Sequence, residues 1–152
     1  MKAVCAGILT LILLTGATGA QVVKACRVLD VRTGTLERDV FIQIEEGRIV
    51  EVGRSMPDPS GAELIDLSDY TVLPGLIDLH THLCDNSYMG QAWDWWTFAA
   101  PVFGIAGAVN AEKVLQAGFT TVRDVGDHYY CGVSLRDAIE AGWTTGPRVF
   151  AS

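Results

Sequence analysis

The chain has 152 residues, and its 11 basic and 18 acidic side chains give a formal net charge of −7. This acidic balance argues against nucleic-acid binding, which needs a basic surface. Hydrophobic residues make up 49% of the sequence, enough to build a packed core and to argue against intrinsic disorder. A chain of this length suits one modest domain.

Residues 1–20 are predicted to be a secretory signal peptide. Lys2 gives a positive start, an apolar core runs from Ala3 to Leu14, and small residues lead to a cleavage site after Ala20. The apolar stretch is too short to span a bilayer comfortably. We therefore expect export to the periplasm or the extracellular space, with no stable membrane span after cleavage. A signal anchor or a buried helix is the alternative interpretation.

Residues 21–74 are predicted to be a small antiparallel, β-sandwich-like segment. Apolar and polar residues alternate from Val40 to Glu45, and Glu46-Gly47 then gives a hairpin signal before the next apolar run. The predicted strands cover residues 21–32, 40–45, 49–52, 63–67 and 70–73.

Residues 75–152 are predicted to alternate strands with helices. The turn at Pro74-Gly75 precedes Leu76, Ile77 and Leu79, an apolar run typical of a parallel strand buried on both faces. Helices are expected at 106–117 and 135–141, and further strands at 119–123 and 149–151. This βαβαβ order indicates an α/β fold with a parallel sheet. Trp93, Trp95 and Trp96 lie between the first strand and helix, either as a site lining or as a packing cluster.

His80 and His82 end the first of these strands. Side chains two residues apart on a strand point the same way and lie about 7 Å apart along it. Two imidazoles on one face of a rigid strand suit an ion such as Zn²⁺. The alternative interpretation is that both histidines face solvent at a strand end by chance.

Several motifs resemble those of one enzyme family. Pro74–His82, P-G-L-I-D-L-H-T-H, resembles the first-strand signature of the metal-dependent amidohydrolase superfamily. Gly118–Gly126, G-F-T-T-V-R-D-V-G, resembles the second barrel strand of its imidazolonepropionase-like and Xaa-Pro dipeptidase-like branch. Ser134–Ser152 is similar to the next helix, a G-P-R turn and the third strand, and Asp39–Gly53 to a hairpin that precedes the barrel.

The resemblance implies the N-terminal part of a TIM-like (β/α)₈ hydrolase barrel, with about three of its strands in residues 75–152. A complete barrel needs about 250 residues. We therefore expect a truncated barrel that is inactive by itself.

By resemblance, the complete enzyme hydrolyses a carbon–nitrogen bond in an amide, a cyclic amide or an Xaa-Pro dipeptide with metal-activated water. His80 and His82 would bind the more buried ion of a centre with one or two metals, with Zn²⁺ as the default. The family's bridging lysine or acidic residue, later histidines and catalytic aspartate have no counterparts here. Lys113 falls on a helix, the wrong element, so no catalytic base is expected within this chain.

Other candidate residues surround the expected barrel mouth. Asp78 either orients a ligand imidazole or is a structural carboxylate. His128 is either a mouth residue or an exposed loop histidine. Arg123 closes the second strand beside Asp124, which we expect to cap the following turn.

Cys84 and Cys131 are both expected at this mouth. Spacing leaves open whether they form a disulfide or remain free thiols.

Two other functional classes compete with the exported hydrolase of a small-molecule or dipeptide substrate. One is a non-catalytic truncated gene product with an incomplete metal site, and the other is a small αβ binding domain. The sequence leaves the substrate, the metal and the oligomeric state open.

Overall fold

A computed structural model describes residues 19–57, 61–85 and 99–152 of the chain. The chain divides into two compact units, Met1–Pro74 and Gly75–Ser152, each described by itself below. Most of the predicted signal peptide and all three clustered tryptophans lie outside the described residues. Within the described part, no helix is long and apolar enough to cross a membrane.

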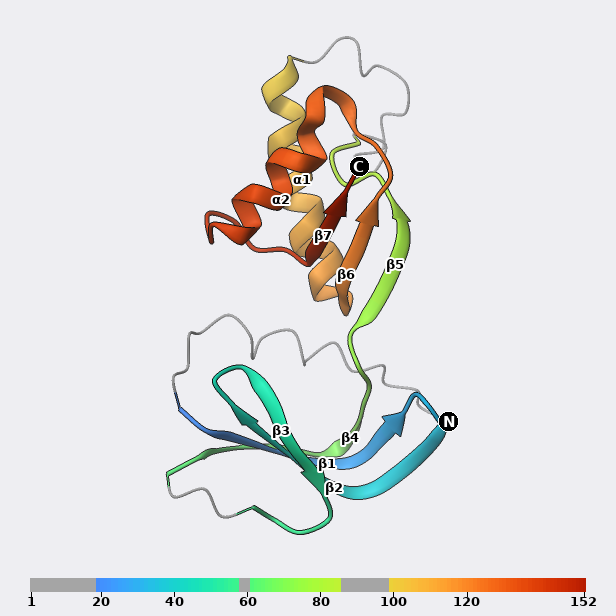
Figure 1. The fold of residues 1–152 in the computed structure, drawn as a ribbon, viewed down its shortest axis with the longest axis vertical. Helices are drawn as coiled ribbons and strands as arrows, with labels where there is room; N and C mark the ends of the chain where they lie inside the picture. The colour runs from blue at the N-terminus through green and yellow to red at the C-terminus, as the bar shows by residue number, and fades with distance from the viewer. Residues whose placement is uncertain (1–18, 58–60, 86–98) are drawn as a thin grey trace. The chain divides into compact units, whose positions relative to one another are not determined.

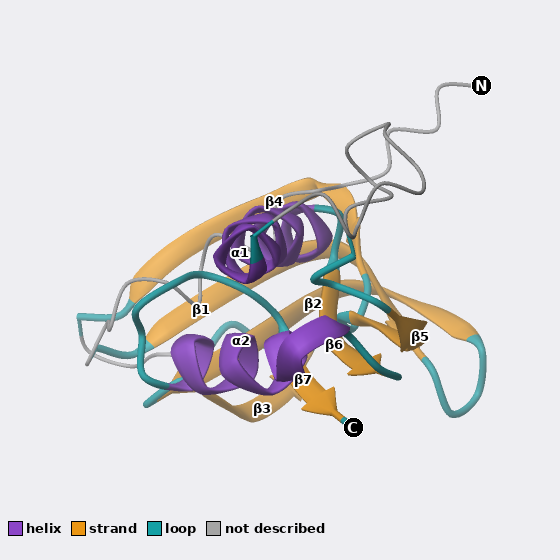
Figure 2. Ribbon diagram, turned by 90° about the horizontal axis from the view of Figure 1, so that it is seen from above, coloured by secondary structure: helices purple, strands orange, loops and turns teal. Residues whose placement is uncertain are grey.

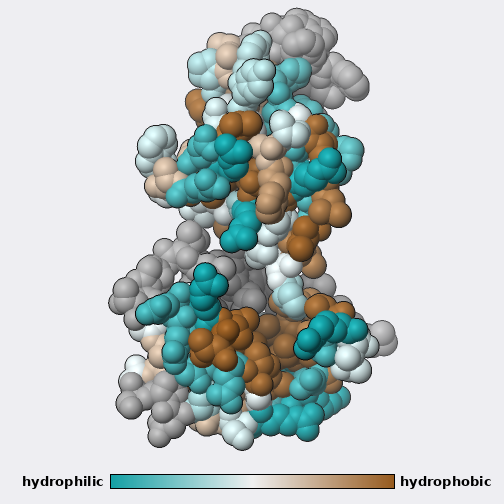
Figure 3. Space-filling view, viewed as in Figure 1, coloured by the Kyte–Doolittle hydropathy of each residue, from teal (hydrophilic) through white to brown (hydrophobic). Residues whose placement is uncertain are grey.

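The described residues of the first unit form one four-stranded sheet in the order β3-β2-β1-β4 (Figure 1). The strands are β1 (Gln21–Asp30), β2 (Thr35–Glu45), β3 (Arg48–Gly53) and β4 (Glu63–Val72). Strand β2 pairs antiparallel with β1 and with β3, whereas β4 pairs parallel with β1. Hydrophobic side chains of both units are also visible at the surface (Figure 3).

The predicted hairpin between β2 and β3 is confirmed. Glu46 and Gly47 both have positive φ, at 49° and 72°, as a two-residue turn of type I′ requires. The alternation that follows from β pleating places Val40 and Ile42 in a core cluster with Val23 and Ala25 of β1.

Two expectations for this unit are wrong. The sheet is mixed rather than wholly antiparallel, because β4 pairs parallel with β1. The two short strands predicted over 63–73 are one strand. Ala25 of β1 pairs with Leu67, and Arg27, two residues further along β1, pairs with Thr71. The polar residues of β4 between Leu67 and Thr71 therefore form a β-bulge. No second layer, which a sandwich requires, is formed by the described residues of this unit.

The second unit confirms the predicted βαβαβ order. Strands β5 (Leu76–Thr81), β6 (Phe119–Asp124) and β7 (Arg148–Ala151) form a parallel sheet in that order. Helix α1 (Ala100–Gln116) joins β5 to β6, and α2 (Cys131–Glu140) joins β6 to β7. Figures 1 and 2 show both helices on the same side of the three strands.

The helices end where the sequence indicates, but both begin earlier than predicted. Pro101 lies in the first turn of α1. The backbone N–H groups of a first turn have no acceptor within the helix, so proline is tolerated there and the helix can start at Ala100. Gly118 follows α1 with φ 96°, a conformation that favours glycine at a helix C-terminus. The core between helices and sheet contains residues from every layer: Leu83, Cys84, Phe103, Ala111, Val122, Cys131, Leu135 and Val149.

The prediction that β5 is buried on both faces is wrong. Ile77 is 62% exposed and Leu79 67% exposed. Strand β5 is at the edge of the three-stranded sheet, and the two helices cover one face only. Apolar side chains therefore reach the surface along β5 (Figure 3).

Candidate metal centre

His80 and His82 lie side by side at the carboxyl end of β5. The centroids of their rings are 5.4 Å apart, and the rings meet edge to face. His80 is exposed on the strand, while His82 lies one residue beyond its end and is half-buried. The structure therefore brings together the two imidazoles that the sequence singled out.

The ring of His82 is fixed by a hydrogen bond from its Nδ1 atom to the carbonyl oxygen of Gly126, at 2.6 Å. A carbonyl oxygen only accepts, so Nδ1 carries the proton in this contact. In the neutral imidazole, Nε2 then keeps its lone pair. Metal-binding histidines commonly donate one ring N–H to a carbonyl and bind the ion through the other nitrogen.

Asp124, the last residue of β6, is 1% exposed and holds the loop after β5. One carboxylate oxygen accepts the N–H of Leu83 at 2.8 Å, and the other accepts the N–H of Gly126 at 3.2 Å. The second bond is the turn cap that the sequence predicted. The first bond joins β6 to the residue that follows His82.

Asp127 extends the same contact. Its carboxylate accepts the N–H of Cys84 at 3.1 Å. Burial, followed by a hydrogen bond with Asp124, raises the pKa of Asp127 to about 7, since two adjacent carboxylates cannot both ionise freely. Gly132 allows this pair, because a Cβ atom there would lie 3.1 Å from an oxygen of each.

A disulfide joins Cys84 to Cys131, with the Cα atoms 6.1 Å apart across 47 residues of sequence. The sequence spacing had left open whether these two cysteines are bonded or free, and the structure shows that they are bonded. The bond connects the loop after His82 to the first residue of α2. Leu83 and Cys84 are thus attached to the end of β6 and to the residues that follow it, through Asp124, Asp127 and Cys131.

The other candidate residues lie differently. Asp78 accepts the backbone N–H of His80 at 3.0 Å rather than an imidazole N–H. Arg123 is exposed on β6. The ring of His128 packs edge-on against Phe103, 5.5 Å between centroids. Across the described residues, no three His, Cys, Asp or Glu side chains gather closely enough to hold a metal ion.

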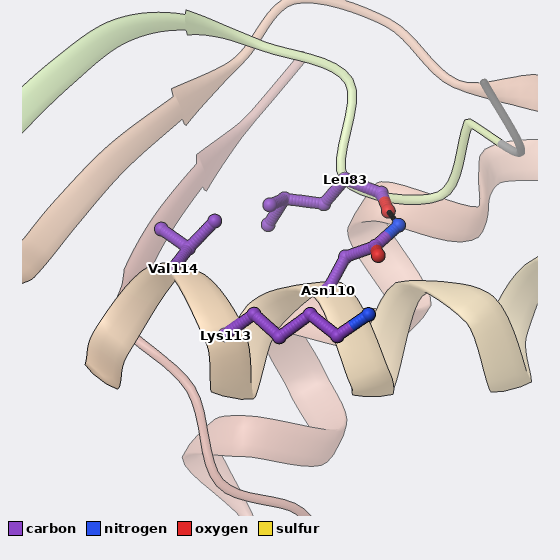
Figure 4. Close-up of a pocket in the computed structure, with 4 residues that line it drawn as sticks. All are labelled: Leu83, Asn110, Lys113 and Val114. Carbon is purple, nitrogen blue, oxygen red and sulfur yellow. Dashed lines mark hydrogen bonds between the residues drawn. The ribbon is translucent and has the colours of Figure 1, made fainter. Parts of the chain in front are cut away.

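A hollow of about 140 Å³ lies beside the loop after β5, lined by Leu83, Asn110, Lys113 and Val114 (Figure 4). Asn110 donates to the carbonyl oxygen of Leu83 at 2.9 Å. Ligand pockets usually measure about 300–1,000 Å³. The hollow is therefore too small for a dipeptide, and Asn110 has a structural role in it.

Sequence reasoning missed the part that Asp127 takes in this site. The signal was present in D-V-G-D, where two carboxylates flank a Val-Gly pair at the end of a strand. Their shared contact with Leu83 and Cys84, more than 40 residues away in sequence, appears only in the structure.

The sequence profile of the amidohydrolase family matches residues 71–152, more than half of the chain. The chain belongs to the amidohydrolase family. Its relatives include the dihydroorotase of Geobacter metallireducens, 41% identical over 66 residues, which are 43% of this chain and 15% of that protein. The 5'-deoxyadenosine deaminase of Methanothrix thermoacetophila is 41% identical over 64 residues, which are 42% of this chain and 15% of that protein.

Solved structures match a larger share of the chain. A Xaa-Pro dipeptidase with bound methionine superposes with a TM-score of 0.77 at 31% identity, over 88% of this chain and 33% of that one. A prolidase complexed with N-methylphosphonate-L-proline gives 0.73 at 33% identity, over 88% of this chain and 31% of that one. These neighbours agree with the Xaa-Pro dipeptidase-like branch expected from the motifs. The chain spans about one third of their length.

Proposed function

We propose that this chain is the metal-binding N-terminal part of an exported hydrolase that cleaves carbon–nitrogen bonds with metal-activated water. The family supports hydrolytic chemistry. The single observation that carries the metal assignment is the His82–Gly126 contact beside the His80 ring. It frees one nitrogen of His82 to bind an ion while it fixes the ring.

The donor set fits a divalent ion of the Zn²⁺ type. Imidazole nitrogen is a preferred ligand of Zn²⁺, and His80 and His82 present two such rings 5.4 Å apart. Catalytic zinc sites use about three protein ligands. We propose that the remaining ligands lie outside the described residues. When bound, such an ion lowers the pKa of a water molecule and polarises the scissile carbonyl.

The contribution of the described residues is positional. Gly126 fixes the orientation of the His82 ring, and Asp124, Asp127 and the disulfide fix the backbone that carries it. None of these groups is assigned as the base that accepts a proton from water.

For the substrate, we favour an Xaa-Pro dipeptide. An Xaa-Pro dipeptidase structure and a prolidase structure match 88% of this chain at 31% and 33% identity, which supports this choice. Export follows from the predicted leader, and the Cys84–Cys131 disulfide supports it because such bonds persist in oxidising compartments.

The test is hydrolysis of a panel of Xaa-Pro dipeptides by the complete protein, produced with Zn²⁺. We expect turnover that chelation abolishes and added metal restores. An exposed substitution on α2, Glu140→Gln, should leave the rate unchanged. No turnover of any dipeptide or cyclic amide by folded, metal-loaded protein would contradict the proposed activity.

A second candidate is a non-catalytic product with an incomplete metal site. The observation that favours it is that no three suitable side chains gather to hold an ion among residues 19–57, 61–85 and 99–152. The same assay distinguishes the two candidates, because this product would give no turnover.

A further inference from the structure

The orientation of His82 depends on a carbonyl group that is itself held in place. The accepting oxygen belongs to Gly126, two residues beyond the end of β6. Gly126 has φ 131°, a conformation that side-chain-bearing residues rarely adopt. The direction of its carbonyl therefore depends on a backbone conformation that needs local support.

Asp124 supplies that support from both sides of the contact. Its two carboxylate oxygens accept the N–H groups of Gly126 and of Leu83, the residue after His82. The acceptor of the His82 proton and the backbone next to His82 are thus bonded to the same carboxylate. Asp124 also lies opposite Thr81 in the β5–β6 register, so both strands end at this point.

We propose that Asp124 is a positioning residue that fixes His82 with its proton on Nδ1 and its Nε2 atom free to bind metal. The inference rests on the proposed function only where it treats His82 as a metal ligand. The fixed tautomer itself is a property of the metal-free protein.

The burial of Asp124 supports this role over that of a simple turn cap. A cap needs only the bond to Gly126, and the carboxylates of half-buried Asp30 and exposed Asp66 form comparable local bonds. Burial of a carboxylate at 1% exposure is costly unless its oxygens are satisfied. The additional bond to Leu83, 41 residues away, couples this carboxylate to the strand that carries the histidines.

The test is the tautomer of His82, measured by nitrogen NMR of ¹⁵N-histidine protein without metal at about pH 8, where an ordinary imidazole is neutral. We expect protonated Nδ1 and unprotonated Nε2 in the unaltered chain. Asp124→Asn keeps the side-chain volume but leaves one oxygen acceptor for two N–H groups. We expect it to shift His82 toward the other tautomer and to lower Zn²⁺ affinity about 10- to 100-fold.

Gly126→Ala is the second variant, for the case that Asp124→Asn does not fold. No atom lies within 4 Å of a Cβ placed at Gly126, so alanine acts there only through the disfavoured φ. It should displace the carbonyl and shift the same tautomer. Asp137→Asn is the matched control, the same substitution at an exposed aspartate of α2 that pairs with Arg136. His80 is the internal reference, since its bond to Asp78 is made by the backbone.

Either of two results would overturn the inference. One is His82 protonated on Nε2 in the unaltered chain, and the other is an unchanged Nδ1–H signal in folded Asp124→Asn or Gly126→Ala protein. A tautomer that shifts as expected in a protein without hydrolase activity would sustain the positioning role and reject the proposed function.

Discussion

The Nδ1 atom of His82 lies 2.6 Å from the carbonyl oxygen of Gly126, 44 residues further along the chain. The loop after β5 and the loop after β6 are therefore joined at the imidazole that we propose as a metal ligand. The Cys84–Cys131 disulfide joins the loop after β5 to the first residue of α2.

Reduction of this disulfide should destabilise the protein. A bond that closes a loop of 47 residues restricts the unfolded chain, which typically contributes about 2–4 kcal/mol. We expect Cys84→Ala/Cys131→Ala to lower the free energy of unfolding by that amount in urea titrations. The matched control is Cys26→Ala, because Cys26 is a free cysteine. Equal stability of the double variant and the unaltered protein would show that the bond is absent in solution.

Gly107 and Gly104 on helix α1 should respond to alanine in opposite directions. A Cβ atom at Gly107 would lie 2.6 Å from the Sγ atom of Cys84, so Gly107→Ala should cost about 1–3 kcal/mol. Gly104 has no atom within 4 Å of that position, so Gly104→Ala should stabilise the helix by about 0.5–1 kcal/mol. Thermal unfolding of both variants measures the difference, and equal shifts would contradict the packing of α1 on Cys84.

The pH dependence of stability should contain a contribution from Asp127. Its pKa in the folded protein is about 7 against an ordinary value of 3.8, so the folded state binds the proton more tightly. This contribution is complete below pH 3.8 and is lost as the pH rises through about 7. Asp127→Asn mimics the protonated form of Asp127. In this variant, the free energy of unfolding should therefore fall less between pH 3.8 and about 7 than in the unaltered protein.

Urea titrations from about pH 4 to 8 measure this effect as the difference between Asp127→Asn and the unaltered protein. Asp66 gives the contrast, because hydrogen bonds from Ser68 lower the pKa of its carboxyl group. Its contribution is present above 3.8 and is lost as the pH falls. A constant difference between Asp127→Asn and the unaltered protein at every pH would contradict the raised pKa.

Local signals in the sequence predicted a large part of the fold. The Glu46-Gly47 turn and the ends of α1 and α2 depend on residues that are neighbours in sequence, so their patterns were sufficient. The parallel pairing of β4 with β1 is a long-range contact, and the polar residues between Leu67 and Thr71 indicated a strand break where the structure has a bulge. The exposure of Ile77 was missed because an apolar run does not reveal whether a strand lies at a sheet edge.

For the site, the spacing of His80 and His82 predicted their proximity. The H-x-H pattern predicts that the two imidazole rings lie on one face of the strand. It does not indicate which residues fix the orientation of these rings. Asp124 was interpreted from its place at the end of the second strand as a cap of the following turn, which is correct but incomplete. Its bond to Leu83 depends on the pairing of β5 with β6, which no local pattern encodes.

Export predicts a mature N-terminus at Gln21 or within a residue or two of it. Intact mass or N-terminal sequencing of protein from the extracytoplasmic fraction measures this. Met1 retained on protein from the cytoplasm would reject the leader.

The metal content of the complete protein tests the central claim most directly. We expect bound Zn²⁺ or a similar divalent ion in the unaltered protein and its loss in His80→Ala/His82→Ala, by elemental analysis after gel filtration. Circular dichroism should show that the double variant keeps its fold, since His80 is exposed and His82 half-buried. The same metal content in the folded double variant as in the unaltered protein would contradict the assignment of these histidines as ligands.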